Sequence, residues 1–296
     1  MAISAQLVQQ LREKSSAGMM DCKKALESSN GDLEKAIQYL REKGKATAAQ
    51  KAGRSTRQGL IGTWISSDQK KGSILEVNCE TDFVARTKEF QDFLVHLTRQ
   101  TGEKSIQSLD SLLSQTLNGS ETVEILVKEK IAKLGENIQI KKMAVCGGNP
   151  SSFVGRYIHA PIESAPDCGS LGVLLEVETK DQGLEVKDLV RELCMQVAAA
   201  SPKWIGKNDL DPAIVAKEKE IYKEQCRQSG KPEKAWDKII DGKLADFFRQ
   251  FCLLEQSHVR DSSGKTSIQS LVDSVSKTKG HPVVIKSFVR YKMGEE

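Results

Sequence analysis

The chain has 296 residues, of which 39% are hydrophobic and 28% charged, and its net charge is +4. This length allows two or three domains, and the composition is that of a globular protein rather than a disordered one. The longest apolar runs, such as residues 171–175, are far shorter than the roughly 20 residues of a membrane span, and the N-terminus lacks the basic and apolar regions of a secretory signal. We therefore expect a cytoplasmic protein.

The cysteines do not suggest disulfides or a metal centre. They are scattered, and no two of them form a C-x-x-C pair; their positions are 22, 79, 146, 168, 194, 226 and 252. An odd, dispersed set in a chain without a signal peptide is typical of reduced thiols. We expect no structural zinc.

Residues 1–43 predict a bundle of three short helices. Ser4 is a suitable cap for the first helix, and the second is expected to start near Met20 after a break at 15–18. The Asn30-Gly31-Asp32 sequence predicts the end of the second helix and the cap of the third, whose apolar residues recur every 3.6 positions. Such a bundle is too small for an enzyme and is typical of partner-binding modules.

Residues 44–57 contain small and basic side chains and little to bury, which indicates a linker, in part helical. Residues 1–55 hold ten Lys and Arg against six Asp and Glu, and this excess accounts for the whole net charge. A nucleic-acid site usually has a stronger basic stripe with interleaved aromatic residues, and only Trp64 is near. We interpret the basic run as a solvated linker and expect no direct nucleic-acid contact; an RNA-binding adaptor is the alternative.

The remainder of the chain contains an internal repeat. The matched segments are 60–65 with 153–158, 72–77 with 172–177, 90–97 with 186–193, and 135–141 with 280–286. Each half reads strand, strand, helix, helix, strand. This order predicts an α+β fold with two antiparallel three-stranded sheets backed by helices. The first subdomain is expected over 58–148, and the second over 149–204 and 256–293.

The offset between the repeats rises from 96 residues at the helices to 145 at the last strands. This jump predicts an insertion of roughly 45–50 residues in the second half, which we place at 205–255. Asp211-Pro212 is a typical helix start, residues 229–232 form a turn, and an apolar stripe runs from Trp236 to Phe251. The insertion is predicted to be a projecting antiparallel helical hairpin.

Motifs for catalysis or nucleotide binding are lacking. The best phosphate-loop candidate, Gly264-Lys265-Thr266, has Val259 in place of the first glycine. The four histidines are isolated from one another, and His96 lies on an apolar helix, where a partly buried structural role is expected. We predict a protein that is not an enzyme. Because a Cys–His pair can be distant in sequence, a thiol enzyme is the second alternative.

The two repeats diverge after the strand that ends near Val77. The second repeat continues as an ordinary polar turn over 178–183, whereas the first continues as Asn78-Cys-Glu-Thr-Asp-Phe-Val-Ala85. Thr81 or Asp82 could cap a helix that has Phe83 in its first turn. Because Phe83 lies seven residues before Phe90, spacing alone favours a core position; the alternative is an apolar anchor that enters a partner's pocket.

This segment resembles the signature of the bacterial elongation factor Ts family. Residues 11–26 are similar to that family's opening helices, a ubiquitin-associated-like bundle, and further matches are 131–137 and 287–291. The matches span nearly the whole chain in the family's order. The resemblance implies guanine-nucleotide exchange on elongation factor Tu, a GTPase of translation, with no cofactor.

The resemblance also implies roles for particular residues. The segment Thr81 to Val84, which includes Asp82 and Phe83, would push into the GTPase near its magnesium site. The bundle around Met19 and Met20 and the C-terminal module of this chain would both bind the GTPase domain. Spacing alone places Met19 and Met20 in the bundle core. The hairpin would touch another domain of the GTPase or a second copy of the chain, so that a dimeric assembly is open.

Overall fold

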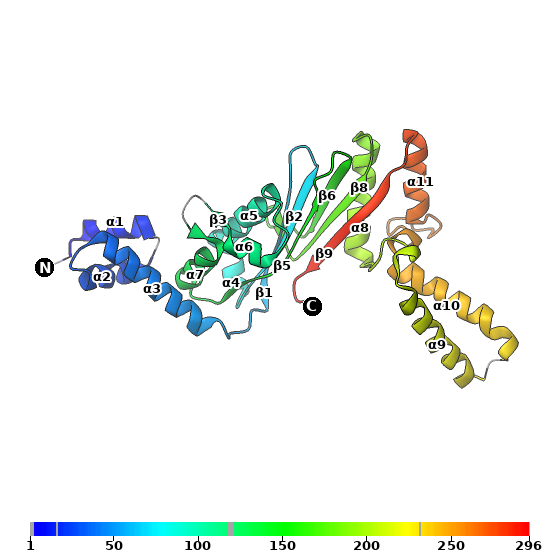
Figure 1. Cartoon of the computed structure of the whole chain (residues 1–296), viewed down its shortest axis with the longest axis horizontal. Helices are drawn as coiled ribbons and strands as arrows, with labels where there is room; N and C mark the ends of the chain where they lie inside the picture. The colour runs from blue at the N-terminus through cyan, green and yellow to red at the C-terminus, as the bar shows by residue number, and fades with distance from the viewer. Residues whose placement is uncertain (1–2, 16, 118–120, 231, 296) are drawn as a thin grey trace.

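The protein is elongated, with a helical bundle at one end, two sheets in the middle and a helical hairpin at the other end (Figure 1). The structure, a computed structural model, describes residues 3–15, 17–117, 121–230 and 232–295. No helix among these described residues combines the length and the apolar composition that crossing a membrane requires.

The N-terminal bundle consists of three helices, as predicted: α1 (Ala5–Ser15), α2 (Met19–Ser28) and α3 (Leu33–Lys51). Ser4 Oγ accepts a hydrogen bond from the Leu7 amide at 3.2 Å and so caps α1. The Asn30 and Gly31 backbones take φ values of 51° and 83°, the left-handed region that glycine and asparagine tolerate best. Asp32 then caps α3. The buried side chains of the bundle are Val8, Leu11, Cys22, Ala25, Leu26 and Ala36.

The linker expected over 44–57 is helical in part, but its helical part is packed and not solvated. Helix α3 continues to Lys51 and packs against α7 (Val123–Leu134). Gly44 and Ala48 are buried, and a Cβ at Gly44 would lie 3.5 Å from the Cβ of Ala132. The small side chains therefore allow two helices to approach closely, so the first half of this segment is a packed helix.

The first repeat forms a sheet in the order β5-β2-β1-β7, in which every pairing is antiparallel. Its strands are β1 (Gln58–Ile65), β2 (Lys71–Cys79), β5 (Ile138–Gly147) and β7 (Cys168–Gly169). The expectation of three strands is wrong here by one short strand, because the two residues of β7 come from the second repeat and pair with the free edge of β1. A strand of two residues has no alternation that could be read from the sequence.

The second repeat forms the antiparallel three-stranded sheet β6-β8-β9, as predicted. Its strands are β6 (Ser152–His159), β8 (Leu171–Glu178) and β9 (Val284–Lys292). The other elements of the two repeats are α4 (Asp82–Ala85), α5 (Lys88–Glu103), α6 (Leu109–Ser114), α8 (Leu184–Ala200), α11 (Ile268–Lys279) and a two-stranded ribbon of β3 (Thr116–Leu117) with β4 (Glu121–Thr122).

The two repeats have separate helix-covered cores, and their sheets also pack on each other. The largest fully buried side chains include Phe90 of α5 in the first core and Phe153 of β6 in the second. A further cluster joins the sheets; its buried members are Ile61, Ile74, Cys146, Val154 and Leu174. The sheets therefore form one continuous central body between the bundle and the hairpin.

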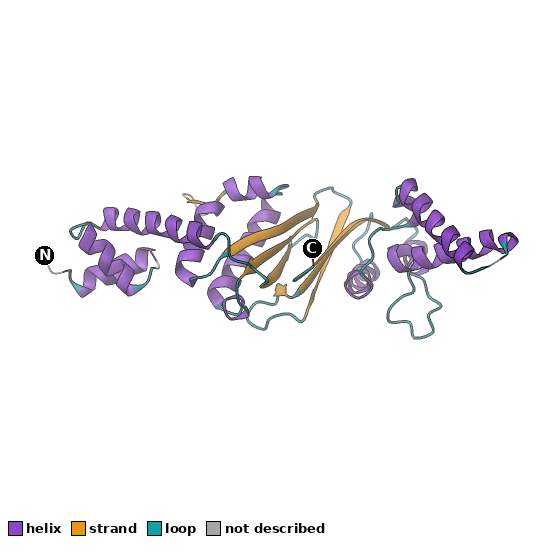
Figure 2. Ribbon diagram, turned by 90° about the horizontal axis from the view of Figure 1, so that it is seen from below, coloured by secondary structure: helices purple, strands orange, loops and turns teal. Residues whose placement is uncertain are grey.

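The insertion is a helical hairpin, as predicted, of α9 (Pro212–Gln228) and α10 (Trp236–Phe251). Three short 3-10 turns flank these helices: η1 (Lys207–Asp209), η2 (Glu233–Ala235) and η3 (Leu253–Glu255). Trp204 and Cys252 are paired at its base, where the Trp204 ring contacts Phe247 and Phe251 with centroid distances of 6.2 and 6.4 Å. The hairpin projects away from the sheets (Figure 2).

Candidate partner-binding site

The segment that distinguishes the first repeat forms a short helix between β2 and α5. Thr81 has an extended backbone (φ −126°, ψ 156°), and its Oγ1 accepts a hydrogen bond from the Val84 amide at 3.4 Å, which caps α4. Thr87 then caps α5 by accepting from the Phe90 amide at 3.3 Å and ends α4 by donating to the Val84 carbonyl at 2.7 Å. The sequence thus places two N-caps six residues apart, and the chain changes direction between them.

This change of direction decides the position of Phe83. Its side chain is 78% exposed, whereas Val84 and Ala85 are buried in the first core. Because Thr87 interrupts the helix, Phe83 is not on the same continuous face as Phe90, and the core position favoured by spacing is wrong. The Phe83 side chain is thus accessible from solvent, which the alternative of an apolar anchor requires.

Asp82 lies beside Phe83 and is also accessible. Its carboxylate forms an ion pair with Arg86 at 3.0 Å, with 48% of the Asp82 side chain exposed. An exposed pair one helical turn apart is weak, so the carboxylate is free to exchange Arg86 for a partner's groups. The four predicted residues are therefore adjacent but not alike: Thr81 caps, Val84 anchors, and Asp82 and Phe83 face outward.

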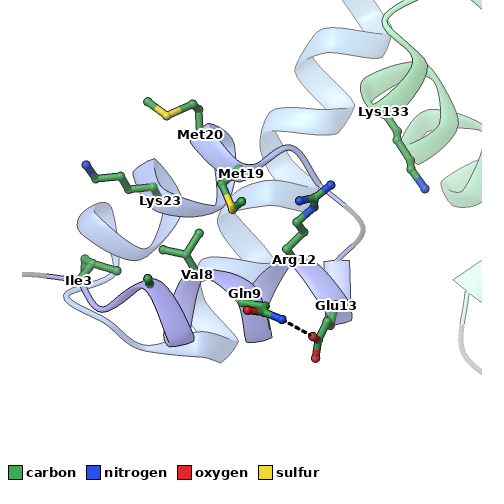
Figure 3. Close-up of a pocket in the computed structure, with 10 residues that line it drawn as sticks. Ile3, Val8, Gln9, Arg12, Glu13, Met19, Met20, Lys23 and Lys133 are labelled. Carbon is green, nitrogen blue, oxygen red and sulfur yellow. Dashed lines mark hydrogen bonds between the residues drawn. The ribbon is translucent and has the colours of Figure 1, made fainter.

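The spacing-based core position is also wrong for Met19 and Met20. They start α2 immediately after Gly18 and are 53% and 64% exposed. Both line an open groove of about 940 Å³ whose apolar floor includes Ile3 and Val8 (Figure 3). Methionine side chains are flexible and polarizable, which suits a surface that adapts to a partner.

The rim of the same groove is predominantly basic. Arg12 and Lys23 come from the bundle, and Lys133 comes from α7 of the first repeat (Figure 3). Lys133 is already paired with Glu89 at 2.7 Å. Because the groove contains residues of both the bundle and the first repeat, the packing of α3 on α7 determines its shape.

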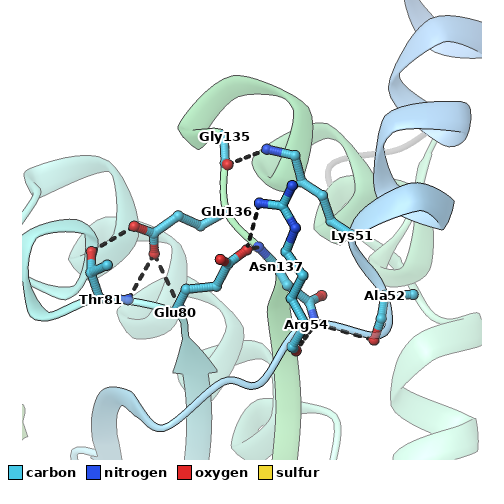
Figure 4. A network of polar contacts seen from close by, with 8 residues as sticks. All are labelled: Lys51, Ala52, Arg54, Glu80, Thr81, Gly135, Glu136 and Asn137. Atoms are coloured by element: carbon cyan, nitrogen blue, oxygen red, sulfur yellow. Dashed lines mark hydrogen bonds and ion pairs between the residues drawn. The ribbon is translucent and has the colours of Figure 1, made fainter.

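Sequence reasoning missed the polar network behind Thr81. Glu136 Oε2 accepts hydrogen bonds from the amides of Glu80 and Thr81 at 3.1 and 3.0 Å, and Glu136 Oε1 accepts from Thr81 Oγ1 at 2.5 Å. Figure 4 shows the two segments facing each other. Glu136 follows the helix-ending Gly135 and is 55 residues from Thr81 in the sequence, so no local pattern indicates this contact.

Most of the basic side chains between Arg41 and Arg57 are engaged within the molecule. Arg41 pairs with Glu121, Lys43 with Asp21 at 2.6 Å, and Arg54 with Glu80 at 3.5 Å; Lys51 donates to the Gly135 carbonyl. These contacts orient the basic side chains toward neighbouring elements.

The thiols and imidazoles do not form a nucleophilic site. All seven cysteines are buried, and burial raises the pKa of the Cys79, Cys146 and Cys168 thiols to about 12, opposite to the shift that activates a nucleophile. His96 is partly buried, as predicted, and its Nε2 is buried without a hydrogen-bond partner. Within the described ranges, no three His, Cys, Asp or Glu side chains are grouped to hold a metal ion.

The sequence model of the family described as Elongation factor TS matches residues 80–295. Elongation factor Ts of Clostridium perfringens (strain SM101 / Type A) is 41% identical over 293 residues, covering 99% of this chain and 93% of the relative. Elongation factor Ts of Clostridium botulinum (strain Eklund 17B / Type B) is 40% identical over 296 residues, and that of Clostridium tetani (strain Massachusetts / E88) is 39% identical over 298, with coverages of 99% and 93–94%.

Proposed function

The chain belongs to the elongation factor Ts family, a family of translation elongation factors, and on that premise we propose that it is a guanine-nucleotide exchange factor that binds elongation factor Tu and promotes GDP release. The observation that carries the proposal is the Phe83 side chain, 78% exposed at the start of a capped helix. The proposed activity is not catalysis in the enzymatic sense: it acts through protein–protein binding.

The physical requirement for exchange is a difference in affinity. A GTPase holds GDP through Mg²⁺ and backbone amides around the phosphates. A factor that binds the empty GTPase more tightly than the loaded one must, by reciprocity, weaken nucleotide binding by the same ratio. We assign the largest part of that difference to Phe83, which would enter the GTPase beside its magnesium site.

Asp82 supplies the charge next to this apolar contact. Its exposed carboxylate would accept hydrogen bonds from the loop that faces the magnesium ion, in exchange for its weak pair with Arg86. Thr81 and Val84 keep the pair in place, one as the cap and the other as the buried anchor. The proposed displacement needs neither a bound metal nor a nucleotide on this chain.

The remaining elements are proposed to hold the partner. The bundle of residues 1–43, which we propose to be ubiquitin-associated-like, would grip the GTPase domain through the Met19 and Met20 groove. The hairpin at 205–255 would reach another domain of the GTPase or a second copy of this chain. Ile221 on its α9 helix is 41% exposed and available for such a contact.

The test is release of a fluorescent GDP from purified elongation factor Tu, followed by stopped flow with and without this protein. The proposal expects acceleration at substoichiometric amounts, since each molecule of an exchange factor acts repeatedly. No acceleration with a folded sample would contradict the proposal and would direct attention to the RNA-binding alternative, which a salt-dependent gel shift with RNA detects.

A further inference from the structure

Two carboxylates behind the proposed contact segment each accept hydrogen bonds from the backbone of the other's segment. Glu136 accepts the amides of Glu80 and Thr81, and the Glu80 Oε1 atom accepts the Asn137 amide at 2.7 Å. The chain around residue 80 is thus tied to the chain around residue 136 in both directions (Figure 4). Hydrogen bonds of this kind, from backbone amides to a carboxylate, are among the stronger ones in proteins.

The position of Glu136 is fixed by the elements on either side of it. Gly135 takes a left-handed φ of 77° and ends α7, and β5 begins two residues after Glu136. Since Cys79 pairs with Ile138 in the sheet, the end of β2 and the start of β5 lie side by side. The Glu136 side chain therefore lies next to the turn at Thr81.

Asn137 extends the network to the exit of the N-terminal bundle. Its side chain is 2% exposed, and its Nδ2 donates to the carbonyls of Ala52 and Arg54 at 3.3 and 2.9 Å. Arg54 also pairs with Glu80. One set of contacts thus fixes both the segment that presents Phe83 and the chain that leads from the bundle.

Glu136 also determines what the Thr81 hydroxyl can do. A hydroxyl has a single proton to donate and lone pairs to accept with. Because Thr81 Oγ1 donates its proton to Glu136 at 2.5 Å, its lone pairs face the Val84 amide that it caps. Removing the carboxylate would release the hydroxyl and would leave two partly buried amides without an acceptor, at a cost that favours a different backbone path.

We propose that Glu136 is a positioning residue for nucleotide exchange: it holds the Thr81 turn in the conformation that exposes Asp82 and Phe83. This inference rests on the proposed exchange function and adds a residue that need not touch the partner. Displacing a contact group by about 1 Å can reduce a rate by as much as roughly 100-fold. Loss of Glu136 would slow the step in which GDP is displaced, and it would leave unchanged the affinity that the Met19 and Met20 groove contributes.

The informative variant is Glu136→Gln, which has nearly the same shape. A glutamine has one acceptor oxygen where the carboxylate has two. If that oxygen accepts both backbone amides, as Glu136 Oε2 does, the NH₂ group meets the Thr81 hydroxyl, and the hydrogen bond that the hydroxyl donates must reverse or break. We expect the maximal rate of GDP release to fall between about 10- and 100-fold, with the half-saturating concentration of factor changed by no more than about twofold. Glu124→Gln is the matched control: Glu124 begins the same helix α7, and its side chain pairs only with Lys128 among the described contacts.

A double variant separates positioning from a general structural effect. If Glu136 acts through Asp82 and Phe83, then Glu136→Gln adds nothing further to a variant that carries both Asp82→Ala and Phe83→Ala, because the two groups it positions are gone. A general destabilisation would instead multiply the two losses. Thermal unfolding of every variant is measured in parallel, and Thr81→Val, which removes only the hydroxyl, serves as a second probe and should reproduce the loss of maximal rate.

The outcomes separate the inference from the function beneath it. Acceleration by the wild-type chain, slow exchange by Glu136→Gln and by Thr81→Val, and no further loss on top of Asp82→Ala with Phe83→Ala support the inference. Wild-type rates in Glu136→Gln, or losses that multiply with those of Asp82→Ala and Phe83→Ala together, overturn it while the exchange function stands. No acceleration by the wild-type chain overturns both.

Discussion

The two repeats of the central body share one framework. Leu60 pairs with Val77 in the first sheet as Phe153 pairs with Val177 in the second. Both sheets also have a glycine under the covering helix. A Cβ at Gly62 would lie 2.8 Å from Leu94 of α5, and one at Gly155 would lie 2.2 Å from Val190 of α8. Such close approach explains why the same small residue stands at equivalent places in both halves.

The repeats differ at the turn after the middle strand. The offset between them is 100 residues at the middle strands and 96 at the covering helices, and the difference equals the four residues of α4. The first repeat therefore has one extra helical turn, which carries Phe83. In the second repeat, α8 begins directly at Leu184 after a polar turn.

The groups that fix the two turns have opposite charge. In the first repeat the carboxylate of Glu136 accepts from the backbone of the turn. In the second, Lys279 at the end of α11 pairs with Asp181 at 2.9 Å and with Glu185 at 2.7 Å. The comparison shows how a duplicated framework can present an exposed aromatic residue in one copy only: the sheet and helix stay the same, and the turn and its fixing residue change.

The largest effect is expected from Phe83→Ala. A buried hot spot contributes about 2–4 kcal/mol, so we expect nucleotide release to slow roughly 30- to 1,000-fold. Because Phe83 is 78% exposed, truncating it removes little packing and the melting temperature should stay near the wild-type value. Stopped-flow release of fluorescent GDP gives the rate, and circular dichroism gives the melting curve.

Leu184→Ala is the matched control, since Leu184 is 75% exposed at the corresponding turn of the second repeat. We expect exchange by this variant to match that of the wild-type chain. Equal losses in the two variants would mean that both turns are contact segments, and the functional asymmetry between the repeats would be wrong.

A smaller effect is expected from Asp82→Ala. A hydrogen bond to a charged group contributes about 1.5 kcal/mol or more, which corresponds to a loss of about 10-fold in the rate of release. Arg86→Ala breaks the same intramolecular ion pair from the other side, and exposed pairs contribute little to stability. If Arg86→Ala slows exchange as much as Asp82→Ala, the pair itself matters, and a contact of Asp82 with the partner is not needed.

The sequence predicted the framework better than the site. The repeat offsets and strand patterns led to the α+β arrangement and to the hairpin, because burial imposes a regular alternation on strands and helices. The seven-residue spacing between Phe83 and Phe90 led to a wrong core position for Phe83. Spacing alone does not show that Thr87 caps a second helix and so separates the two residues. The core position expected for Met19 was wrong for a similar reason. Helix α2 begins directly after Gly18, and the residues of this helix that fill the bundle core lie further along it.

Glu136 and Lys279 could not be assigned from the sequence at all. Their contacts join segments far apart along the chain, and an acidic or basic residue at the end of a helix is ordinary by any local pattern. Only the pairing of β2 with β5, and of β8 with β9, brings each of them to its turn. The resemblance to a family indicated residues 81–84 as the proposed contact segment, and the sheet register shows which residue holds that segment.

The ion pairs of Lys279 with Asp181 and Glu185 predict that the stability of the fold depends on pH while the exchange rate does not. Lys279 donates hydrogen bonds to the carboxylates of Asp181 and Glu185. These bonds lower the pKa values of both acids and raise the pKa of Lys279. The acids therefore stabilise the fold above their ordinary values of about 4 and lose this contribution as the pH falls through their folded pKa values. The lysine stabilises it below about 10.4 and loses its contribution as the pH rises further.

We therefore expect Lys279→Ala to lower the melting temperature slightly between roughly pH 5 and pH 9, and the difference from the wild type to shrink below about pH 4. The exchange rate at neutral pH should be unchanged. Thermal unfolding across this pH range is the measurement. A difference that stays constant down to pH 2 would show that Lys279 acts by packing and not through its two carboxylates.

The smallest effect is expected from Cys79→Ser, at the start of the turn that carries Phe83. Cys79 Sγ donates to the Thr81 carbonyl at 3.1 Å, and at the equivalent position Thr179 Oγ1 donates to the Asp181 carbonyl at 2.9 Å. A hydroxyl thus already makes this bond in one repeat, so we expect Cys79→Ser to exchange nucleotide within about twofold of the wild type. Burial, followed by the nearby Glu136 carboxylate, raises the pKa of the Cys79 thiol to about 12, so iodoacetamide at pH 8 should leave it unmodified in the folded chain and label it after denaturation. Rapid labelling of the folded chain together with lost exchange would make the thiol itself functional, and the two turns would then differ in chemistry as well as in shape.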